Sequence, residues 1–282
     1  MPELPEAETI VRGLRPAIIG RVVEQTRVPK PDILREPRGR FARKVRGRRI
    51  VGVDRRGKNV LLRLDDGSVV AVNLGMTGRL LPFDSAPRGA DRPGHPAVHL
   101  LLEGGGVLVF DDTRRFGTVE CLSAAEWSAR SARMGPEPLD ERYTAHALRE
   151  GLSRSRAPVR SWLLDQRRIA GVGNIYANEA LFLSGVHPRR RARDLTGAEA
   201  TRVHRSIRRV LRAAIHAGGT TIRDYRDASG AEGRYARRLL VYARDGEACS
   251  RCGAVIERVV FGNRSAFFCP GCQPAKSRGA SS

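Results

Sequence analysis

The chain has 282 residues, of which 41% are hydrophobic, and this suits two modest folded domains and excludes global disorder. Its 51 lysines and arginines outnumber 30 acidic residues, giving a formal net charge of +21, which favours a polyanionic partner such as nucleic acid over a proteome that is merely rich in arginine. No apolar run approaches the ~18–20 residues of a membrane-spanning helix, and the acidic N-terminus does not resemble a secretory leader. We therefore expect a cytoplasmic protein with no membrane partner.

The first half of the chain predicts one helix and then a series of strands. Pro5 suits a first helical turn, Ile10, Leu14 and Ile18 recur at helical spacing, and Gly20 can end the helix, so we expect it over residues 5–19. An Asp-Asp-Gly turn and a triple glycine each separate two β-type segments, which predicts two hairpins. The helix and strands together indicate a β-sandwich domain. The predicted strands are residues 21–28, 49–54, 59–64, 68–74, 97–103, 107–111 and 117–122.

The second half changes to helical spacing after a Pro/Gly stretch at residues 134–138, which predicts a domain boundary there. Thr196 and Glu199 fit a capping box, and the glycines at 218–219 can close the helix that follows. The rest of that helix surface is rich in arginine, which indicates either a solvated face or a face that binds DNA. The tail after Gln273 is expected to be disordered. The arginines on the surface of the helix that follows Thr196 are Arg202, Arg205, Arg208, Arg209 and Arg212.

Four of the five cysteines form two pairs, each with two residues between its members and with sixteen residues between the pairs. This spacing predicts one structural zinc ion with four thiolate ligands, Cys249, Cys252, Cys269 and Cys272. Disulfides are the alternative, but no export signal is evident and cytosolic thiols stay reduced. Strands at 255–261 and 266–268 would form a hairpin that projects Arg264 from its tip. Cys121 stands alone in a strand-like segment and predicts a small core residue.

The N-terminus combines groups suited to covalent chemistry on a sugar. Removal of the initiator methionine would leave Pro2 as a secondary amine, and an α-amino group with a pKa near 7.7–8.0 is partly unprotonated at neutral pH. Such an amine forms an iminium ion with an aldehyde-level carbon. Glu3 and Glu6 supply carboxyl groups, one of which could act as an acid. Lys58 is one of only four lysines, so it indicates either proton transfer or a solvated strand end.

Several motifs, in order, resemble those of the formamidopyrimidine-DNA glycosylase family over about residues 2–273. The segment at 2–9, PELPEAET, resembles the family's N-terminal signature, and Leu4 stands where the related oxidised-pyrimidine group has glycine. The segment GVGNIYANE at 171–179 resembles a helix-two-turn-helix, and the four-cysteine finger ends the match. The other matching segments are GK at 57–58, LGMTG at 74–78, RRFG at 114–117 and MGPEPL at 134–139.

This resemblance implies an α+β fold with four parts. They are a catalytic β-sandwich domain at residues 2–133, a helix-two-turn-helix DNA-binding domain with a lesion-capping loop at 134–238, a zinc finger at 239–273 and a disordered tail at 274–282. It also implies a monomeric, nucleoid-associated base-excision-repair enzyme that acts on oxidised purines in double-stranded DNA as a glycosylase and AP lyase.

The resemblance assigns the chemistry to four residues. Pro2 would attack C1′, Glu3 would be the general acid, Lys58 would contact the backbone and donate a proton, and Arg264 would hold a phosphate and assist the second elimination. The DNA contacts that it implies are His95, Arg114, Asn174, Met76, Phe116, Arg154, Ser155 and Arg156.

Two departures and one ambiguity accompany these contacts. Met76, Arg114 and Phe116 match an intercalating trio, although core packing is the ordinary interpretation of a Met and a Phe at strand ends. Thr113 replaces a common proline, and Ser155 replaces a basic residue in the phosphate-binding stretch. A relative that prefers oxidised pyrimidines and a non-catalytic zinc-finger DNA-binding protein remain the alternative functions.

Overall fold

The structure is a computed structural model that describes residues 2–89, 92–222, 225–261 and 263–275. The chain divides into two compact units, one formed by Met1–Arg133 with Ala214–Ala236 and the other by Met134–Ala213 with Arg237–Ser282. Segment 214–236, which is part of the predicted domain at 134–238, packs with the first unit. Two contacts hold this segment against helix α1 (Leu4–Ile18): the Thr220 amide donates to the Glu6 carboxylate at 2.8 Å, and Ala228 packs against Gly13.

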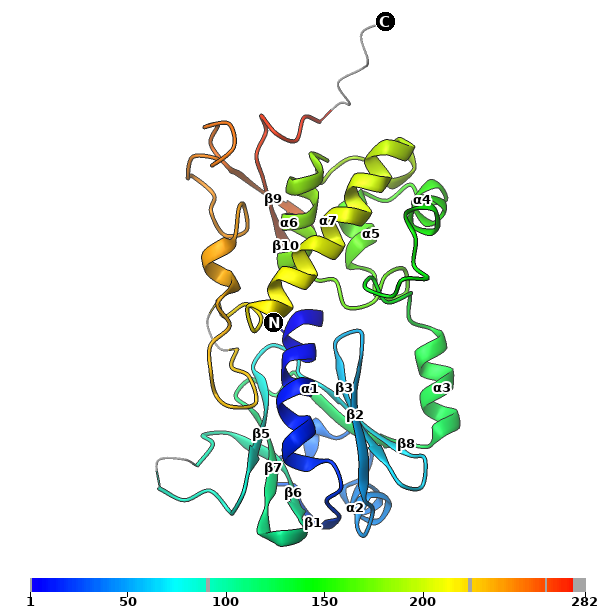
Figure 1. Ribbon diagram of the computed structural model, residues 1–282, viewed down its shortest axis with the longest axis vertical. Coiled ribbons are helices and arrows are strands. Elements are labelled where there is room, and N and C mark those ends of the chain that lie inside the picture. The colour runs from blue at the N-terminus through cyan, green and yellow to red at the C-terminus, as the bar shows by residue number, and fades with distance from the viewer. Residues whose placement is uncertain (1, 90–91, 223–224, 262, 276–282) are drawn as a thin grey trace, which may run out of the picture. The chain divides into compact units, whose positions relative to one another are not determined.

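The first unit contains two antiparallel four-stranded sheets, with strand orders β1-β6-β7-β5 and β2-β3-β4-β8. Helix α1 (Leu4–Ile18) lies beside them, and α3 (Ala124–Ala132) follows the last strand (Figure 1). The strands are β1 (Val23–Arg27), β2 (Ile50–Arg56), β3 (Asn59–Leu64), β4 (Val69–Asn73), β5 (Gly78–Phe83), β6 (Pro96–Leu102), β7 (Val107–Asp112) and β8 (Thr118–Leu122).

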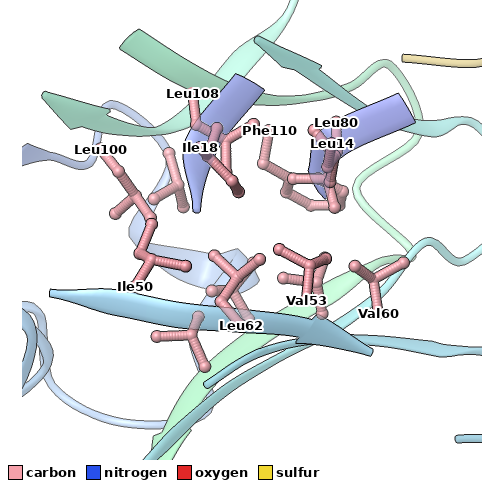
Figure 2. Close-up of a cluster of buried hydrophobic side chains, with 14 of the residues drawn as sticks. Leu14, Ile18, Ile50, Val53, Val60, Leu62, Leu80, Leu100, Leu108 and Phe110 are labelled. Carbon is pink, nitrogen blue, oxygen red and sulfur yellow. The ribbon is translucent and has the colours of Figure 1, made fainter. Parts of the chain in front are cut away.

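The inner faces of the two sheets and one side of α1 form a single hydrophobic core. In Figure 2, Leu100 and Phe110 extend from one sheet toward Val53 and Leu62 of the other, with Leu14 of α1 beside them. On the outer face of the second sheet, Trp127 of α3 covers a smaller apolar cluster. The turns that carry the candidate site begin where the strands of this sandwich end.

The predicted helix and strands of this unit are confirmed, with ends that differ by a few residues, and Cys121 is a buried core residue as expected. Three of the helices and strands in this unit were not predicted, namely α2, α3 and β5. Helix α2 (Arg38–Val45) buries only Phe41 and Val45 among many charged residues, so its periodicity is weak. Strand β5 contains Pro82, which the edge position of this strand tolerates because one side needs no hydrogen-bonding partner.

The second unit is mainly helical and ends in a two-stranded sheet of β9 (Glu257–Phe261) and β10 (Arg264–Phe268). The predicted capping box at the start of its long helix is confirmed, because Thr196 and Glu199 exchange side chain to backbone hydrogen bonds. The α-helices are α4 (Ala145–Ser153), α5 (Val159–Leu164), α6 (Asn174–Ser184) and α7 (Gly197–His216), the last of which crosses into the first unit near its end. The short 3₁₀ turns among the described residues are η1 (Pro31–Ile33), η3 (Glu103–Gly105), η4 (Ala192–Asp194) and η5 (Tyr235–Arg238).

The predicted α+β fold class is therefore confirmed, with one correction in the finger hairpin. Arg264 was expected in the connecting turn, but it is the first residue of β10 and pairs with Phe261 across the sheet. The connection is two residues long, which is the commonest hairpin length. Residues 276–282 of the predicted disordered tail lie outside the described residues. Across the part of the chain that is described, no helix is both long and apolar enough to span a bilayer.

Candidate nucleic-acid interface and active site

The first residues of the chain are held tightly at the start of α1. Pro2 and Glu3 are buried, and the Glu3 amide donates to the Glu6 carboxylate at 2.8 Å. The other oxygen of Glu6 accepts the Thr220 amide, so one buried carboxylate fixes two chain segments that are more than 200 residues apart. Glu6 thus acts as an anchor for the backbone, which leaves Glu3 as the first-turn carboxyl placed next to Pro2.

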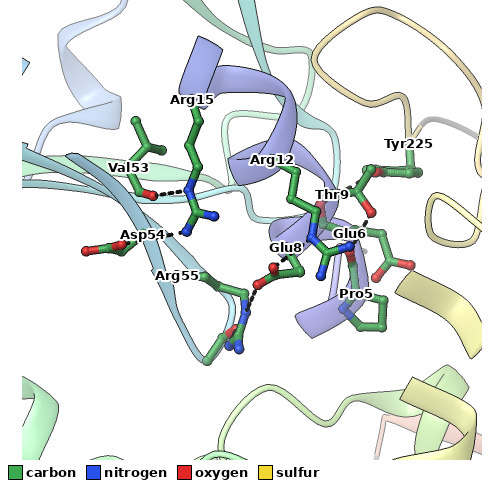
Figure 3. A network of polar contacts seen from close by, with 11 residues as sticks. Pro5, Glu6, Glu8, Thr9, Arg12, Arg15, Val53, Asp54, Arg55 and Tyr225 are labelled. Carbon is green, nitrogen blue, oxygen red and sulfur yellow. Dashed lines mark hydrogen bonds and ion pairs between the residues drawn. The ribbon is translucent and has the colours of Figure 1, made fainter. Parts of the chain in front are cut away.

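A polar network connects this helix start to the hairpin that carries Lys58 (Figure 3). Glu8 bridges Arg12 at 3.0 Å and Arg55 at 3.2 Å, and the Arg55 guanidinium also donates to the Gly57 carbonyl at 2.9 Å. Lys58 follows Gly57 in the two-residue turn between β2 and β3, where Gly57 has a φ of +58° that a side chain would disfavour. Lys58 is half-buried at this turn.

The turn that carries Met76 lies at the same end of the sheet. Asn59 and Asn73 oppose each other on β3 and β4, and their side chains hydrogen-bond at 3.1 Å. Asn73 then accepts the Gly75 amide, also at 3.1 Å. A Cβ atom on Gly75 would lie 2.5 Å from the Phe116 carbonyl carbon, so only glycine lets the two turns meet this closely.

The loop that follows β7 presents Arg114 and Phe116. The Asp112 carboxylate, which is 1% exposed, accepts hydrogen bonds from the Gly117 amide at 2.8 Å and the Thr77 hydroxyl at 2.5 Å. Thr77 in turn accepts the Arg114 amide at 3.0 Å. The guanidinium of Arg114 lies 4.6 Å from the centre of the Phe116 ring.

Met76 and Phe116 are not core residues. The Met76 residue is 37% exposed and Phe116 is 57% exposed, so the core-packing interpretation of these two side chains is wrong. Full burial of a Met or Phe side chain stabilises a fold by roughly 1.5–3 kcal/mol, and these two side chains forgo part of that gain. The arrangement is typical of a surface that contacts a partner.

His95 is exposed and lies at the start of β6, beside the end of β7. Its amide donates to the buried Asp111 carboxylate at 2.6 Å, and its carbonyl accepts the Asp112 amide at 3.1 Å. Two adjacent aspartates therefore fix the backbone of His95 and the Arg114 loop at one place.

In the second unit, Asn174 is the first residue of α6, directly after the turn from α5. Gln166 holds that turn, because its side chain accepts the Gly171 amide and donates to the Val172 carbonyl, both at 2.8 Å. The positive end of a helix dipole at such a start favours a nearby negative charge such as a phosphate.

Buried Arg160 connects Asn174 to the finger hairpin. Its guanidinium donates to the Asn174 side-chain oxygen at 2.5 Å and to the Ser265 carbonyl at 2.7 Å. The side-chain NH₂ group of Asn174 also donates to the Ser265 carbonyl, at 3.1 Å. Burial, and then the positive charge of Arg264, lowers the pKa of Arg160 to about 10. Exposed Arg264 directly precedes Ser265, whose carbonyl accepts the hydrogen bonds of Arg160 and Asn174.

The three residues predicted to contact phosphate at 154–156 differ in their exposure to solvent. Arg154 and Arg156 are exposed, whereas Ser155 is buried and its hydroxyl accepts the Ala157 amide at 3.3 Å. Ser155 therefore shapes the loop, and the two flanking arginines remain available to a ligand.

The four finger cysteines converge on one point, with their sulfur atoms all within 4.8 Å of one another. Tetrahedral Zn–S bonds of about 2.3 Å place sulfur atoms roughly 3.8 Å apart, so the cluster fits one zinc ion with no open position. Gln273 fastens the second pair by accepting the Cys269 amide and donating to the Val186 carbonyl. The predicted structural zinc is confirmed.

Three family models match consecutive parts of the chain. Residues 1–119 match the formamidopyrimidine-DNA glycosylase N-terminal domain, 134–226 match its H2TH domain, and 246–275 match the zinc finger found in FPG and IleRS. The chain belongs to the formamidopyrimidine-DNA glycosylase family. Relatives of that name from Chloroflexus aggregans and Thermomicrobium roseum are 46% and 43% identical, over 97% of this chain and 98–99% of theirs.

Solved structures of the family are similar over nearly the whole chain. The MutM (Fpg) protein of Thermus thermophilus is 41% identical, with a TM-score of 0.86 over 96% of this chain and 98% of that one. The Lactococcus lactis Fpg, in a complex with DNA that contains an abasic site, is 33% identical with a TM-score of 0.88 over 96% and 99%.

Sequence reasoning missed the residues that hold the family motifs in place. Asp112 shows one usable signal, since two aspartates end an otherwise apolar strand. Arg160 shows none, because its partner Ser265 lies 105 residues away. Glu179 falls within a family motif and accepts the backbone amides of Leu240, Val241 and Tyr242, while burial raises its pKa.

Proposed function

We propose that this protein is a DNA glycosylase and AP lyase that removes oxidised purines, such as 8-oxoguanine and formamidopyrimidines, from duplex DNA. The observation that carries the proposal is the arrangement of the first unit. Buried Pro2 and Glu3 are linked through Glu8 and Arg55 to the Lys58 turn, and the turns of Met76 and Arg114 lie at that same end of the strands. This gathers a nucleophile, an acid and a lysine beside two exposed apolar side chains.

The Pro2 amine, once Met1 is removed, attacks C1′ of the damaged nucleotide. The C1′–base bond breaks, the base leaves with the electron pair and takes up a proton, and Glu3 protonates the ring oxygen as the sugar opens. The resulting iminium ion acidifies C2′, so loss of that proton expels the 3′ phosphate. A second elimination expels the 5′ phosphate. Lys58 donates a proton during strand cleavage, and Arg264 binds phosphate and assists the second elimination.

C1′ cannot be reached inside a stacked duplex, so the nucleotide must be everted, at a cost of a few kcal/mol. Met76 and Phe116 would fill the vacated space, and Arg114 would hydrogen-bond the unpaired base. His95, Asn174 and the two arginines that flank Ser155 would hold backbone phosphates. We infer a monomer that acts on chromosomal DNA in the bacterial nucleoid.

Borohydride trapping tests the covalent step. The protein should become linked to a duplex that carries 8-oxoguanine opposite cytosine, and Pro2→Gly should suppress the adduct. Pro37→Gly, an exposed proline that precedes α2, is the matched control and should trap normally. Glu3→Gln should reduce trapping on the 8-oxoguanine duplex more than on a duplex with a ready-made abasic site, because the abasic sugar already opens.

Two alternatives predict different results in the same assay. A relative that prefers oxidised pyrimidines would trap faster on thymine glycol than on 8-oxoguanine, and one L. lactis Fpg structure does hold DNA with an oxidised pyrimidine. A non-catalytic zinc-finger protein would bind both duplexes and form no adduct. An adduct on a residue other than Pro2, mapped by mass spectrometry, would contradict the proposed nucleophile.

A further inference from the structure

Helix α7 displays a line of arginines that the catalytic proposal does not use. Arg202, Arg205, Arg209 and Arg212 are all exposed, and we call these four residues the arginine stripe. Their spacing of three, four and three residues places them on one side of a helix, over about 15 Å of its length. The predicted basic face is therefore real, but Arg208 is not part of it, since its guanidinium donates to the Pro138 and Asp140 carbonyls.

The direction of the stripe is fixed by the other side of the helix. Val203, Ile207, Val210 and Leu211 are buried, so α7 cannot rotate without exposing them. A rigid helix that presents four guanidinium groups loses less conformational entropy on binding than four arginines on a loop would.

Within the described part of the chain, no carboxylate lies within 4.0 Å of a stripe guanidinium. The acidic residue of α7, Glu199, is buried and binds Arg190 instead. The Nε atom of Arg202 donates a hydrogen bond to the Ser184 carbonyl at 3.0 Å. The positive charge of the stripe is thus uncompensated, unlike that of an ordinary solvated helix with alternating charges.

A hollow of 490 Å³ between α4 and the start of α7 extends this surface. Exposed His146 and Arg149 of α4 line it together with Arg202 and Arg205. Glu150, the nearby acid on α4, approaches His146 and Arg154 rather than the stripe. The whole surface therefore carries five arginines and one histidine. Four of the arginines form the arginine stripe, and the hollow lies at its start.

We propose that the arginine stripe is a second binding site for the phosphate backbone of duplex DNA, separate from the phosphate contacts of Asn174 and Arg264. Each strand of B-DNA presents one phosphate per 3.4 Å of axis, so the stripe spans about four phosphates of one strand. Four such contacts give a salt slope near −3.6, which is a loss of about 10²-fold in affinity between 50 and 200 mM salt. A protein with two such sites can hold one duplex while it samples another.

A capture experiment with full-length protein tests this. A biotinylated duplex with an abasic-site analogue is immobilised and saturated with protein, and a fluorescent undamaged duplex is then added at 50 mM salt. We expect wild-type protein to capture the second duplex, and 200 mM salt to reduce that capture about 10²-fold. The triple variant Arg205→Glu, Arg209→Glu, Arg212→Glu should capture at least tenfold less, while it still occupies the immobilised duplex and keeps its wild-type Tm.

Two controls separate the stripe from total charge. Arg38→Glu, Arg40→Glu, Arg43→Glu on α2 changes the net charge equally and should leave capture unchanged, whereas replacing the three stripe arginines with lysine should preserve it. Equal capture by the wild-type and the stripe variant would overturn the proposal, and so would an equal loss in the α2 control. Displacement of the second duplex by poly-glutamate at charge concentrations where heparin fails would assign the stripe to an acidic protein instead.

Discussion

Asp112→Asn should loosen the loop that presents Arg114 and Phe116. The two oxygens of Asp112 accept the Thr77 hydroxyl at 2.5 Å, the Arg114 amide at 3.3 Å and the Gly117 amide at 2.8 Å. Asparagine has the same shape but only one acceptor oxygen, so its NH₂ group must face a donor. One charge-assisted hydrogen bond, worth about 1.5–3 kcal/mol, is lost and a buried amide is left without an acceptor, so we expect a total cost of about 2–4 kcal/mol.

The loop depends on this carboxylate more than on its ion pair. Arg115 adopts a φ of +56°, which for a residue with a side chain costs of order 1–3 kcal/mol. Its ion pair with Asp32 at 3.1 Å joins side chains that are about half-exposed, and such pairs contribute at most about 1 kcal/mol. The buried Asp112 contacts therefore sustain the strained loop.

Thermal unfolding and equilibrium binding measure the two consequences. For a domain of this size, about 2–4 °C of Tm is lost per kcal/mol, so Asp112→Asn should lower the Tm by roughly 5–15 °C. Binding to an abasic-site duplex, measured well below the Tm, should weaken about tenfold, which corresponds to about 1.4 kcal/mol. Asp66→Asn is the matched control, because Asp66 also caps a turn through the Ser68 amide but is exposed.

An Asp112→Asn protein with unchanged Tm and unchanged affinity would refute this reasoning. A lower Tm with full affinity for the abasic-site duplex would show that Asp112 stabilises the fold but that DNA binding does not depend on the rigidity of this loop.

Three further predictions concern other parts of the chain. Removal of zinc by a chelator should unfold the finger and abolish DNA binding, since structural zinc contributes about 10–16 kcal/mol; circular dichroism and a binding titration with and without added zinc check this. Burial raises the pKa of Glu8, but the hydrogen bonds and charges of Arg12 and Arg55 outweigh it and hold that pKa below 4.5. The contacts of Glu8 with Arg12 and Arg55 should thus stabilise the fold above pH 4.5 and lose that effect as the pH falls, so Glu8→Gln should lower the Tm slightly at pH 7 and should lower it less as the pH falls below 4.5. Arg160→Met should cost about 2–4 kcal/mol and weaken DNA binding, because Asn174 loses the donor that orients it; equal binding by this variant and the wild-type would show that Asn174 needs no such support.

The sequence was sufficient for those features whose cause is local. The zinc ligands follow from cysteine spacing, and β3 follows from an apolar run between two turns. Helix α2 could not be predicted in this way because its few apolar residues face a sheet edge that only the fold supplies. The pairing of Arg160 with Ser265 depends on two elements meeting across 105 residues. Motif resemblance located Arg114 and Asn174, but it did not identify the buried groups that hold them.

The buried carboxylates also change how the net charge of +21 should be understood. Glu6, Asp111, Asp112 and Glu179 each accept backbone N–H groups inside the protein, and such donors offset the cost of burying a carboxylate. Among the buried residues that the structure describes, carboxylates outnumber arginines, of which only Arg160 is present. Several acidic groups are thus withdrawn from the surface, whereas Arg160 is the one arginine among the described residues that is buried. The surface that DNA would meet is therefore richer in arginine than the overall composition implies, and neutral substitution of these buried acids should alter stability far more than the salt dependence of DNA binding.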